Sequence, residues 1–170
     1  MARTDRHRDI DPEDGQARVV LAAQLQMIRK ATATPLRTTR KTIDLAAREA
    51  ASDWTVRQVQ RWANFFNSDF ILTFEGFDLD GIDFQVRGEG DDFVKDFREK
   101  VYAIRTALGI RQAEMDRRLR QTRSYGLWER RSVDDVWLSA AQRIVRAMGG
   151  KLKISITHRF NAGINKKISN

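Results

Sequence analysis

The sequence predicts a mainly α-helical fold with a small antiparallel sheet, arranged as two related helical lobes that each end in a β-strand or hairpin. Three observations favour this class. Apolar residues recur at helical spacing along most of the 170 residues, and the chain holds only two prolines. Two short segments, near residues 72 and 154, instead alternate apolar and polar side chains, as strands do. The order of helix, stop and strand also occurs once in each half.

The first half is predicted to form a lobe over residues 17–92, preceded by a flexible arm. Residues 1–16 are polar and mixed in charge, which is typical of a chain terminus that does not pack. Periodicity within the lobe predicts helices over 17–30, 40–51 and 54–66, strands over 70–74 and 82–86, and a turn at Asp80–Gly81. Ser52 and Asp53 are suitable caps for the third helix. The glycine-containing stretch 88–92 is expected to end the lobe.

The second half is predicted to form a lobe over residues 93–158, followed by a basic tail over 159–170. Apolar spacing predicts four helices and then a strand, over 93–108, 112–119, 122–129, 138–148 and 152–156. Gly149–Gly150 is expected to end the fourth helix, because glycine favours the position just past a helix end.

The two halves match in pattern at a constant offset of 82 positions, which is the separation of Gln60 and Gln142. An internal duplication explains this match, although any helix followed by a strand gives a similar pattern. Each half ends in a strand whose apolar face needs a cover and whose edge needs a partner. Pairing of these strands within one chain predicts a pseudo-two-fold monomer, and a homodimer is the alternative.

Composition points to a polyanionic partner and away from catalysis. The chain has 31 Lys and Arg against 23 Asp and Glu, a net charge of +8, which favours nucleic acid over a merely solvated basic surface. The absence of Cys and the presence of only two His exclude the usual zinc and iron–sulfur ligand sets. No phosphate-binding glycine pattern and no catalytic constellation is present, so neither an enzyme, a cofactor nor a metal is expected.

The sequence also predicts where the protein works and which face avoids DNA. No apolar run approaches the length of a membrane span, and the N-terminus lacks the apolar core of a signal peptide, so a cytoplasmic protein without membrane contact is expected. The segment Asp69–Asp92 holds eight acidic residues and one basic residue. A hairpin of this charge is expected to face away from phosphates.

The stretch Arg111–Arg130 carries the most specific pattern. Met115 and Leu119 are spaced for one face of a short helix, and Thr122 can cap a second helix after a tight connection. Two short helices joined in this way can set the second one into a major groove. Six arginines and one acidic residue lie between Arg117 and Arg131, which concentrates positive charge at this place.

Together with Trp128–Arg130 and Leu138–Leu152, this stretch resembles the lambda-repressor-like, XRE-type helix-turn-helix domain over about residues 97–156. The N-terminal half resembles the family only through its last helix and strand, as a degenerate tandem copy would. Three positions depart from the family pattern: Asp116 stands where a small residue is usual, Arg120 replaces the turn glycine, and Gly126 replaces a β-branched residue.

The resemblance implies a sequence-specific double-stranded DNA-binding protein, a transcriptional regulator or repressor that reads the major groove with the helix starting at Thr122. In the family a glutamine at the start of the second helix contacts a phosphate and the first turn of the third helix reads bases. The predicted DNA-binding residues are Gln112, Arg117, Arg118, Arg120, Gln121, Thr122, Arg123, Ser124 and Tyr125, with Arg40 and Lys41 from the first lobe. The alternative is a protein-binding adaptor or antitoxin-like module that kept the fold.

Overall fold

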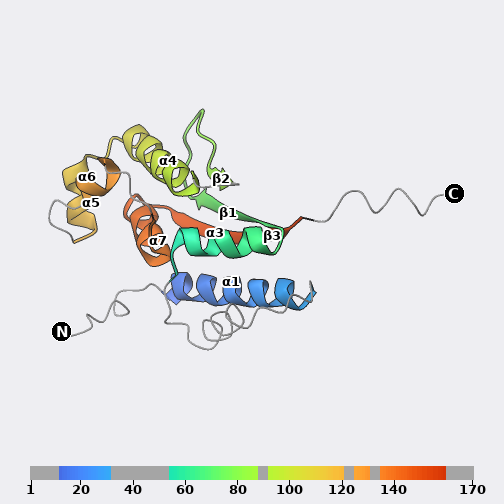
Figure 1. Cartoon of the computed structure of the whole chain (residues 1–170). Coiled ribbons are helices and arrows are strands. Elements are labelled where there is room, and N and C mark those ends of the chain that lie inside the picture. The colour runs from blue at the N-terminus through green and yellow to red at the C-terminus, as the bar shows by residue number, and fades with distance from the viewer. Residues whose placement is uncertain (1–11, 32–53, 88–91, 121–124, 131–134, 160–170) are drawn as a thin grey trace.

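The computed structural model describes residues 12–31, 54–87, 92–120, 125–130 and 135–159, and these form helices around a three-stranded antiparallel sheet (Figure 1). This architecture confirms the predicted fold class. The elements, in chain order, are α1 (Pro12–Ala31), α3 (Val56–Phe65), β1 (Ser68–Glu75), β2 (Gln85–Arg87), α4 (Phe93–Ala107), α5 (Gln112–Arg118), α6 (Tyr125–Arg130), α7 (Leu138–Ala147) and β3 (Lys151–His158).

The sheet joins the two halves of the chain. Its strand order is β2-β1-β3, so β1 is central and pairs antiparallel with β3 along its whole length. Three cross-strand pairs on the inner face are buried and apolar: Phe70 with Ile156, Leu72 with Ile154, and Phe74 with Leu152. The opposite face is polar and partly exposed, as is usual for an antiparallel sheet with one covered side. The strands that end the two halves therefore pair within one chain, as the sequence predicted.

The offset of 82 positions found in the sequence also relates the two halves in space. It carries α3 onto α7 residue for residue, since Val56–Phe65 becomes Leu138–Ala147. It carries Leu72 onto Ile154, and these two residues face each other in the ladder. A residue that maps onto its own cross-strand partner marks a local two-fold axis. The axis of this repeat therefore passes through the middle of the β1–β3 pair.

A second contact obeys the same symmetry at the start of the two helices. Thr55 and Trp137, which are also 82 positions apart, form an isolated antiparallel bridge. On either side of them, the Val56 N–H donates to the Val136 carbonyl and the Leu138 N–H donates to the Trp54 carbonyl, both at 2.8 Å. The two hydrogen bonds are equivalent at the offset of 82, because Val56 corresponds to Leu138 and Trp54 corresponds to Val136. The helices α3 and α7 thus begin side by side and satisfy each other's backbone groups.

Both of these helices also end in the same way. Asn67 (φ 49°) and Gly149 (φ 99°) occupy equivalent positions just past the helix C-caps and adopt positive φ. Glycine and asparagine are the residues that tolerate this conformation best. The next residue, Gly150, is required for a different reason, because a Cβ atom there would lie 2.3 Å from the Phe77 ring. The hairpin loop thereby packs against the start of β3.

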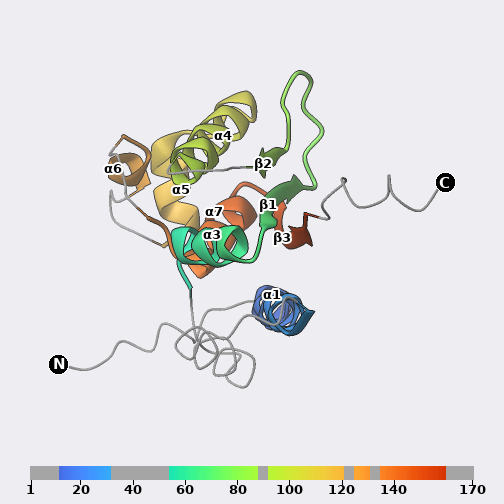
Figure 2. The same ribbon diagram turned by 45° about the vertical axis from the view of Figure 1, so that its right-hand side comes forward.

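Two long helices complete the core on opposite sides of α3 (Figures 1 and 2). On one side, Phe93 and Phe97 of α4 stack on Phe70 and Phe74 of β1, with ring centroids 5.0 and 5.6 Å apart. On the other side, α1 lies against β3 and buries the apolar residues Leu21, Ala22 and Leu25. Burial of these aromatic and aliphatic groups is the main stabilising contribution to the fold.

Several predicted boundaries need correction. The helix α1 begins at Pro12, so residues 12–16 are not part of an arm; proline suits the first turn because its missing N–H has no partner there. The helix α3 begins at Val56 and is capped by Thr55, whose hydroxyl accepts a hydrogen bond from the Gln58 N–H at 3.2 Å. The return strand predicted over 82–86 is shorter in the structure, where β2 covers only Gln85–Arg87. Phe84 lies just before it, and its carbonyl accepts a hydrogen bond from the Phe74 N–H at 2.8 Å.

Other predictions fall outside the described residues and are not decided by the structure. They are residues 1–11 of the arm, the helix over 40–51 with Arg40 and Lys41, the caps Ser52 and Asp53, the stretch 88–91, and the tail from residue 160.

Candidate nucleic-acid interface

The helices α5 and α6 form a compact pair at one end of the molecule, next to the C-terminal end of α4 (Figure 1). Arg120 follows α5 with φ 53°, the left-handed conformation that glycine adopts most easily. Arg120 stands where the family pattern has a glycine, and its backbone adopts a conformation typical of glycine. An arginine holds this conformation at a cost of about 1–2 kcal/mol.

The other two departures from the family pattern are accommodated by contacts between α5 and α6. The Asp116 carboxylate accepts a hydrogen bond from the Tyr125 N–H at 2.9 Å, which satisfies a free donor at the start of α6. A Cβ atom on Gly126 would lie 2.9 Å from Oε1 of Gln112. Glycine at this position leaves room for the Gln112 side chain to lie against α6.

A buried carboxylate, Glu129, connects α4, α5 and α6. Two guanidinium nitrogens of Arg105 donate to it, Nε at 2.6 Å and Nη2 at 3.0 Å. The Tyr125 hydroxyl donates to the same group at 3.1 Å, and Nε2 of Gln112 donates to its second oxygen. A further nitrogen of Arg105 donates to the Ile110 carbonyl at 2.6 Å. Because a buried charge needs partners, this network holds the three helices in one arrangement.

The network also fixes protonation states. Burial raises the pKa of Tyr125, and the charge of Glu129 beside it raises that pKa further. Burial by itself would lower the pKa of Arg105, but its hydrogen bond and ion pair with Glu129 outweigh that effect, and the pKa is raised. The phenol therefore stays neutral and the guanidinium stays charged at any physiological pH.

The prediction that Tyr125 is exposed and contacts bases is wrong. Its residue surface is 1% exposed and its ring packs 5.7 Å from that of Trp128. Tyr125 and Glu129 are four residues apart on α6, so the hydrogen bond between them places both on the inward face. The exposed positions of the described part of α6 are instead Leu127, which is 49% exposed, and Arg130.

The remaining predicted contacts divide into four groups. Gln112 is turned inward, since its amide donates to Glu129. Arg117 and Arg118 both pair with Glu114; the Arg117 side chain is 76% exposed, whereas Arg118 also donates to the Ala147 carbonyl at 2.9 Å. Arg120 is exposed. Gln121, Thr122, Arg123 and Ser124 lie outside the described residues, as do Arg40 and Lys41.

A feature that sequence reasoning missed lies between the C-terminal ends of α5 and α7. Four arginines, Arg118, Arg120, Arg143 and Arg146, line a hollow there together with Leu119 and Ala147. We call it the arginine hollow. None of its described lining residues is acidic. The signal available in the sequence was the pair Arg143 and Arg146, spaced by three positions on the last helix.

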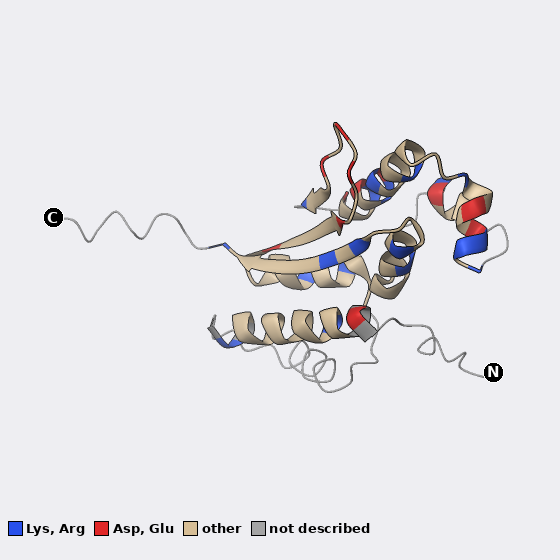
Figure 3. Ribbon diagram, turned by 180° about the vertical axis from the view of Figure 1, so that it is seen from behind, with Lys and Arg blue, Asp and Glu red and all other residues tan. Residues whose placement is uncertain are grey.

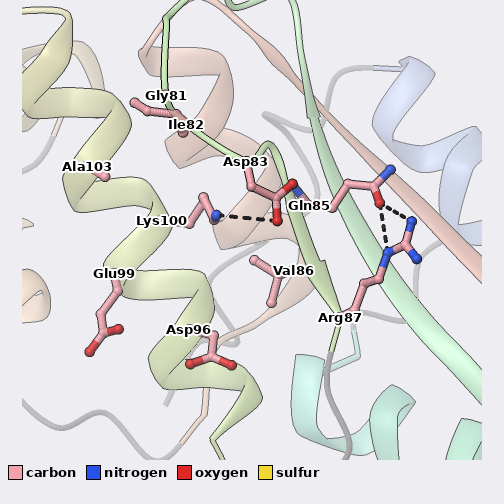
Figure 4. Close-up of a pocket in the computed structure, with 10 residues that line it drawn as sticks. All are labelled: Gly81, Ile82, Asp83, Gln85, Val86, Arg87, Asp96, Glu99, Lys100 and Ala103. Carbon is pink, nitrogen blue, oxygen red and sulfur yellow. Dashed lines mark hydrogen bonds and ion pairs between the residues drawn. The ribbon is translucent and has the colours of Figure 1, made fainter.

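A second hollow, between the hairpin and α4, is lined by charges of both signs (Figure 4). Its charged lining residues are Asp83, Asp96, Glu99, Lys100 and Arg87, and the Asp83 carboxylate lies 3.9 Å from Nζ of Lys100. Acidic residues also mark the hairpin loop in Figure 3, whereas basic ones lie on α7 and β3. Within the described ranges, no group of His, Asp and Glu has an arrangement that could hold a metal ion.

Comparison with family models, with curated proteins and with solved structures found no match to this chain. Among the helices that the structure describes, none has the length and apolar content needed to cross a membrane.

Proposed function

We propose that the protein is a sequence-specific double-stranded DNA-binding protein, a transcriptional regulator or repressor that works in the cytoplasm without enzymatic activity. The observation that carries this proposal is the α5–α6 pair. A short helix, a left-handed turn at Arg120 and a second short helix are held together by Asp116 and anchored to α4 through Glu129. Such a unit can present one side of its second helix to the major groove.

The charge and chemistry of the exposed residues support DNA as the partner. Arg117, Arg120 and Arg130 are exposed on or beside the two helices, so they can approach backbone phosphates, which supply most of the affinity. Leu127 gives α6 an exposed apolar side chain, which suits contact with a thymine methyl group. Base reading by Arg123 and Ser124 remains a prediction from the sequence.

The second candidate is a protein-binding adaptor or antitoxin-like module with the same fold. The burial of Tyr125 and the inward turn of Gln112 favour it, because they remove two of the predicted DNA contacts. The exposed apolar groups Leu127 and Trp137 would suit a protein partner. The absence of any acidic residue in the described lining of the arginine hollow argues for DNA instead.

The experiment that separates these candidates is a selection of bound sequences from random duplex DNA at two salt concentrations. An enriched motif is the result expected for a DNA-reading protein. In a follow-up, Arg123→Ala should relax the preference at one or two base pairs and cost roughly 1–3 kcal/mol. Tyr125→Phe is the control two positions further along the chain, and it should leave the preference unchanged since the Tyr125 hydroxyl faces Glu129.

We further propose that one chain occupies one DNA site. Dimers bind palindromes because a two-fold protein matches a two-fold site. Here β1 and β3 pair with each other within one chain, so neither strand needs the other from a second subunit. Because the two lobes of one chain differ, the DNA site that they contact is expected to be asymmetric. Sedimentation of the complex measures this directly, and two chains on a palindromic site would contradict it.

A further inference from the structure

Two of the four arginines of the arginine hollow, Arg118 and Arg143, are held in place by the ends of two helices. Nη1 of Arg118, on α5, donates to the carbonyl of Ala147, the last residue of α7, at 2.9 Å. Nη2 of Arg143, on α7, donates to the carbonyl of Leu119, the C-cap of α5, at 3.2 Å. Each helix thus supplies the cation that binds the C-terminal carbonyl of the other, where positive charge is favourable.

The contact with Leu119 uses only part of the donor capacity of Arg143. A guanidinium carries five N–H groups, and this contact needs one of them. Arg120 adds a third guanidinium from the turn and Arg146 a fourth from α7. Glu114 pairs with Arg118 but does not line the hollow. Four like charges around one hollow repel each other, so an anion that enters it gains from all of them.

We propose that the arginine hollow binds a phosphate group, and that in the DNA complex this group is a backbone phosphate next to the segment that α6 contacts. Guanidinium groups fit phosphate well because their parallel N–H groups match two phosphate oxygens. Guanidiniums already held by helix carbonyls lose less freedom on binding than free surface side chains do. This step deepens the proposed function and rests on it for the source of the phosphate.

Arg120 is the most informative residue of the hollow. Its positive φ favours glycine, so Arg120→Gly should make the turn more stable while it removes one cation from the hollow. A residue with a purely structural role would not show this combination. Higher stability together with weaker phosphate binding therefore identifies a binding role for the side chain.

The internal repeat supplies a matched control. Arg61 on α3 is the equivalent of Arg143 at the offset of 82, and it is also exposed, but it does not line the hollow. Arg61→Gln and Arg143→Gln therefore make the same change of charge at equivalent places on equivalent helices. Only the second change removes a guanidinium from the arginine hollow.

Two measurements on the full chain test the proposal. The first is thermal unfolding in inorganic phosphate and in chloride at matched ionic strength, since a ligand that binds the folded state raises the midpoint. The second is the affinity for random duplex DNA as a function of salt, whose slope falls by about 0.9 for each phosphate that the protein no longer neutralises. Arg120→Gly and Arg143→Gln should each reduce the phosphate-induced shift, lower the salt slope, or do both. Arg61→Gln should do neither.

The pattern of results distinguishes the sources of the phosphate. A changed salt slope indicates a DNA phosphate, and a reduced shift without a changed slope indicates a free phosphate group; both support the site. Hollow variants that keep the wild-type shift and the wild-type slope would overturn it. If random-sequence selection gives no motif while the hollow variants still show a reduced shift or slope, the proposed function fails and the phosphate site stands.

Discussion

The segments α3–β1 and α7–β3, one from each half of the molecule, repeat one backbone arrangement with different side chains. On α3 the larger side chain, Val59, comes before the smaller one, Ala63. On α7 the order at the equivalent positions is reversed, with Ala141 before Val145. All four residues are fully buried. The comparison teaches that the repeated geometry depends on which positions point inward and much less on which apolar residue fills each of them.

The halves differ most in their surroundings. The strand β1 has a neighbour on both sides, whereas β3 forms the edge of the sheet. The C-terminal half also contains the buried Glu129 network and the arginine hollow. Changes at equivalent positions should therefore have unequal effects, and the following substitutions measure the inequality.

The largest effect is expected for Glu129→Ala. This change leaves the guanidinium of Arg105 buried without its carboxylate, which typically costs about 3–5 kcal/mol of stability. Unfolding in urea gives this free energy. The double variant Arg105→Met, Glu129→Met removes both charges and should recover most of the loss. A single-variant cost below about 1 kcal/mol would show that the network does not hold α4, α5 and α6 together.

The next effect concerns the two residues on the local two-fold axis. Leu72→Ala should cost about 2–5 kcal/mol, as truncation of a fully buried aliphatic side chain usually does. Ile154→Ala should cost less, because Ile154 lies on the edge strand and is 9% exposed. Chemical denaturation of both variants gives the difference. Equal costs would mean that the position of a strand in the sheet does not matter here.

Much of the fold was predictable because its signals are local. The alternation around Leu72 and Ile154 identifies the strands, and the offset of 82 relates α3 and β1 to α7 and β3 before any coordinates are known. The position of the axis follows only from the register of the strands, in which Leu72 faces Ile154. The start of α1 had a local signal, because proline is favoured in the first turn of a helix and α1 begins at Pro12. The limit of β2 had none, since nothing in the local pattern of Ile82 shows which residues pair with β1.

The candidate site was less predictable, for a physical reason. The inward position of Tyr125 follows from a carboxylate that is held by Arg105, which lies 24 residues before Glu129 on another helix. The arginine hollow likewise combines α5 with α7, because Arg118 and Ala147 are 29 residues apart. Contacts of this kind are set by the tertiary arrangement, and single-helix periodicity carries no information about them.

A smaller effect is expected at the equivalent helix ends. Gly149→Ala places a Cβ atom at φ 99° with no atom within 4 Å to clash with it, so the cost is the backbone strain alone, about 1–2 kcal/mol. Asn67→Gly should be close to neutral. It eases the backbone at φ 49° but removes the hydrogen bond from Nδ2 of Asn67 to the Arg159 carbonyl. Thermal unfolding of both variants tests this, and a stabilising Gly149→Ala would contradict it.

The smallest effect concerns a difference in how the two long helices, α1 and α4, are held against the sheet. The helix α4 is held by stacked phenylalanines, whereas α1 has an exposed ion pair, Nζ of Lys151 with Glu13 at 2.6 Å, in addition to its apolar face. Exposed pairs usually contribute about 0.2–1 kcal/mol, and salt screens them. A double-mutant cycle of Glu13→Gln and Lys151→Gln should therefore give a coupling near 0.5 kcal/mol in dilute buffer that vanishes at 1 M salt. A coupling that persisted at high salt would mean that the two side chains anchor α1 to β3 through more than charge. The docking of α1 would then depend on this pair as the docking of α4 depends on its phenylalanines.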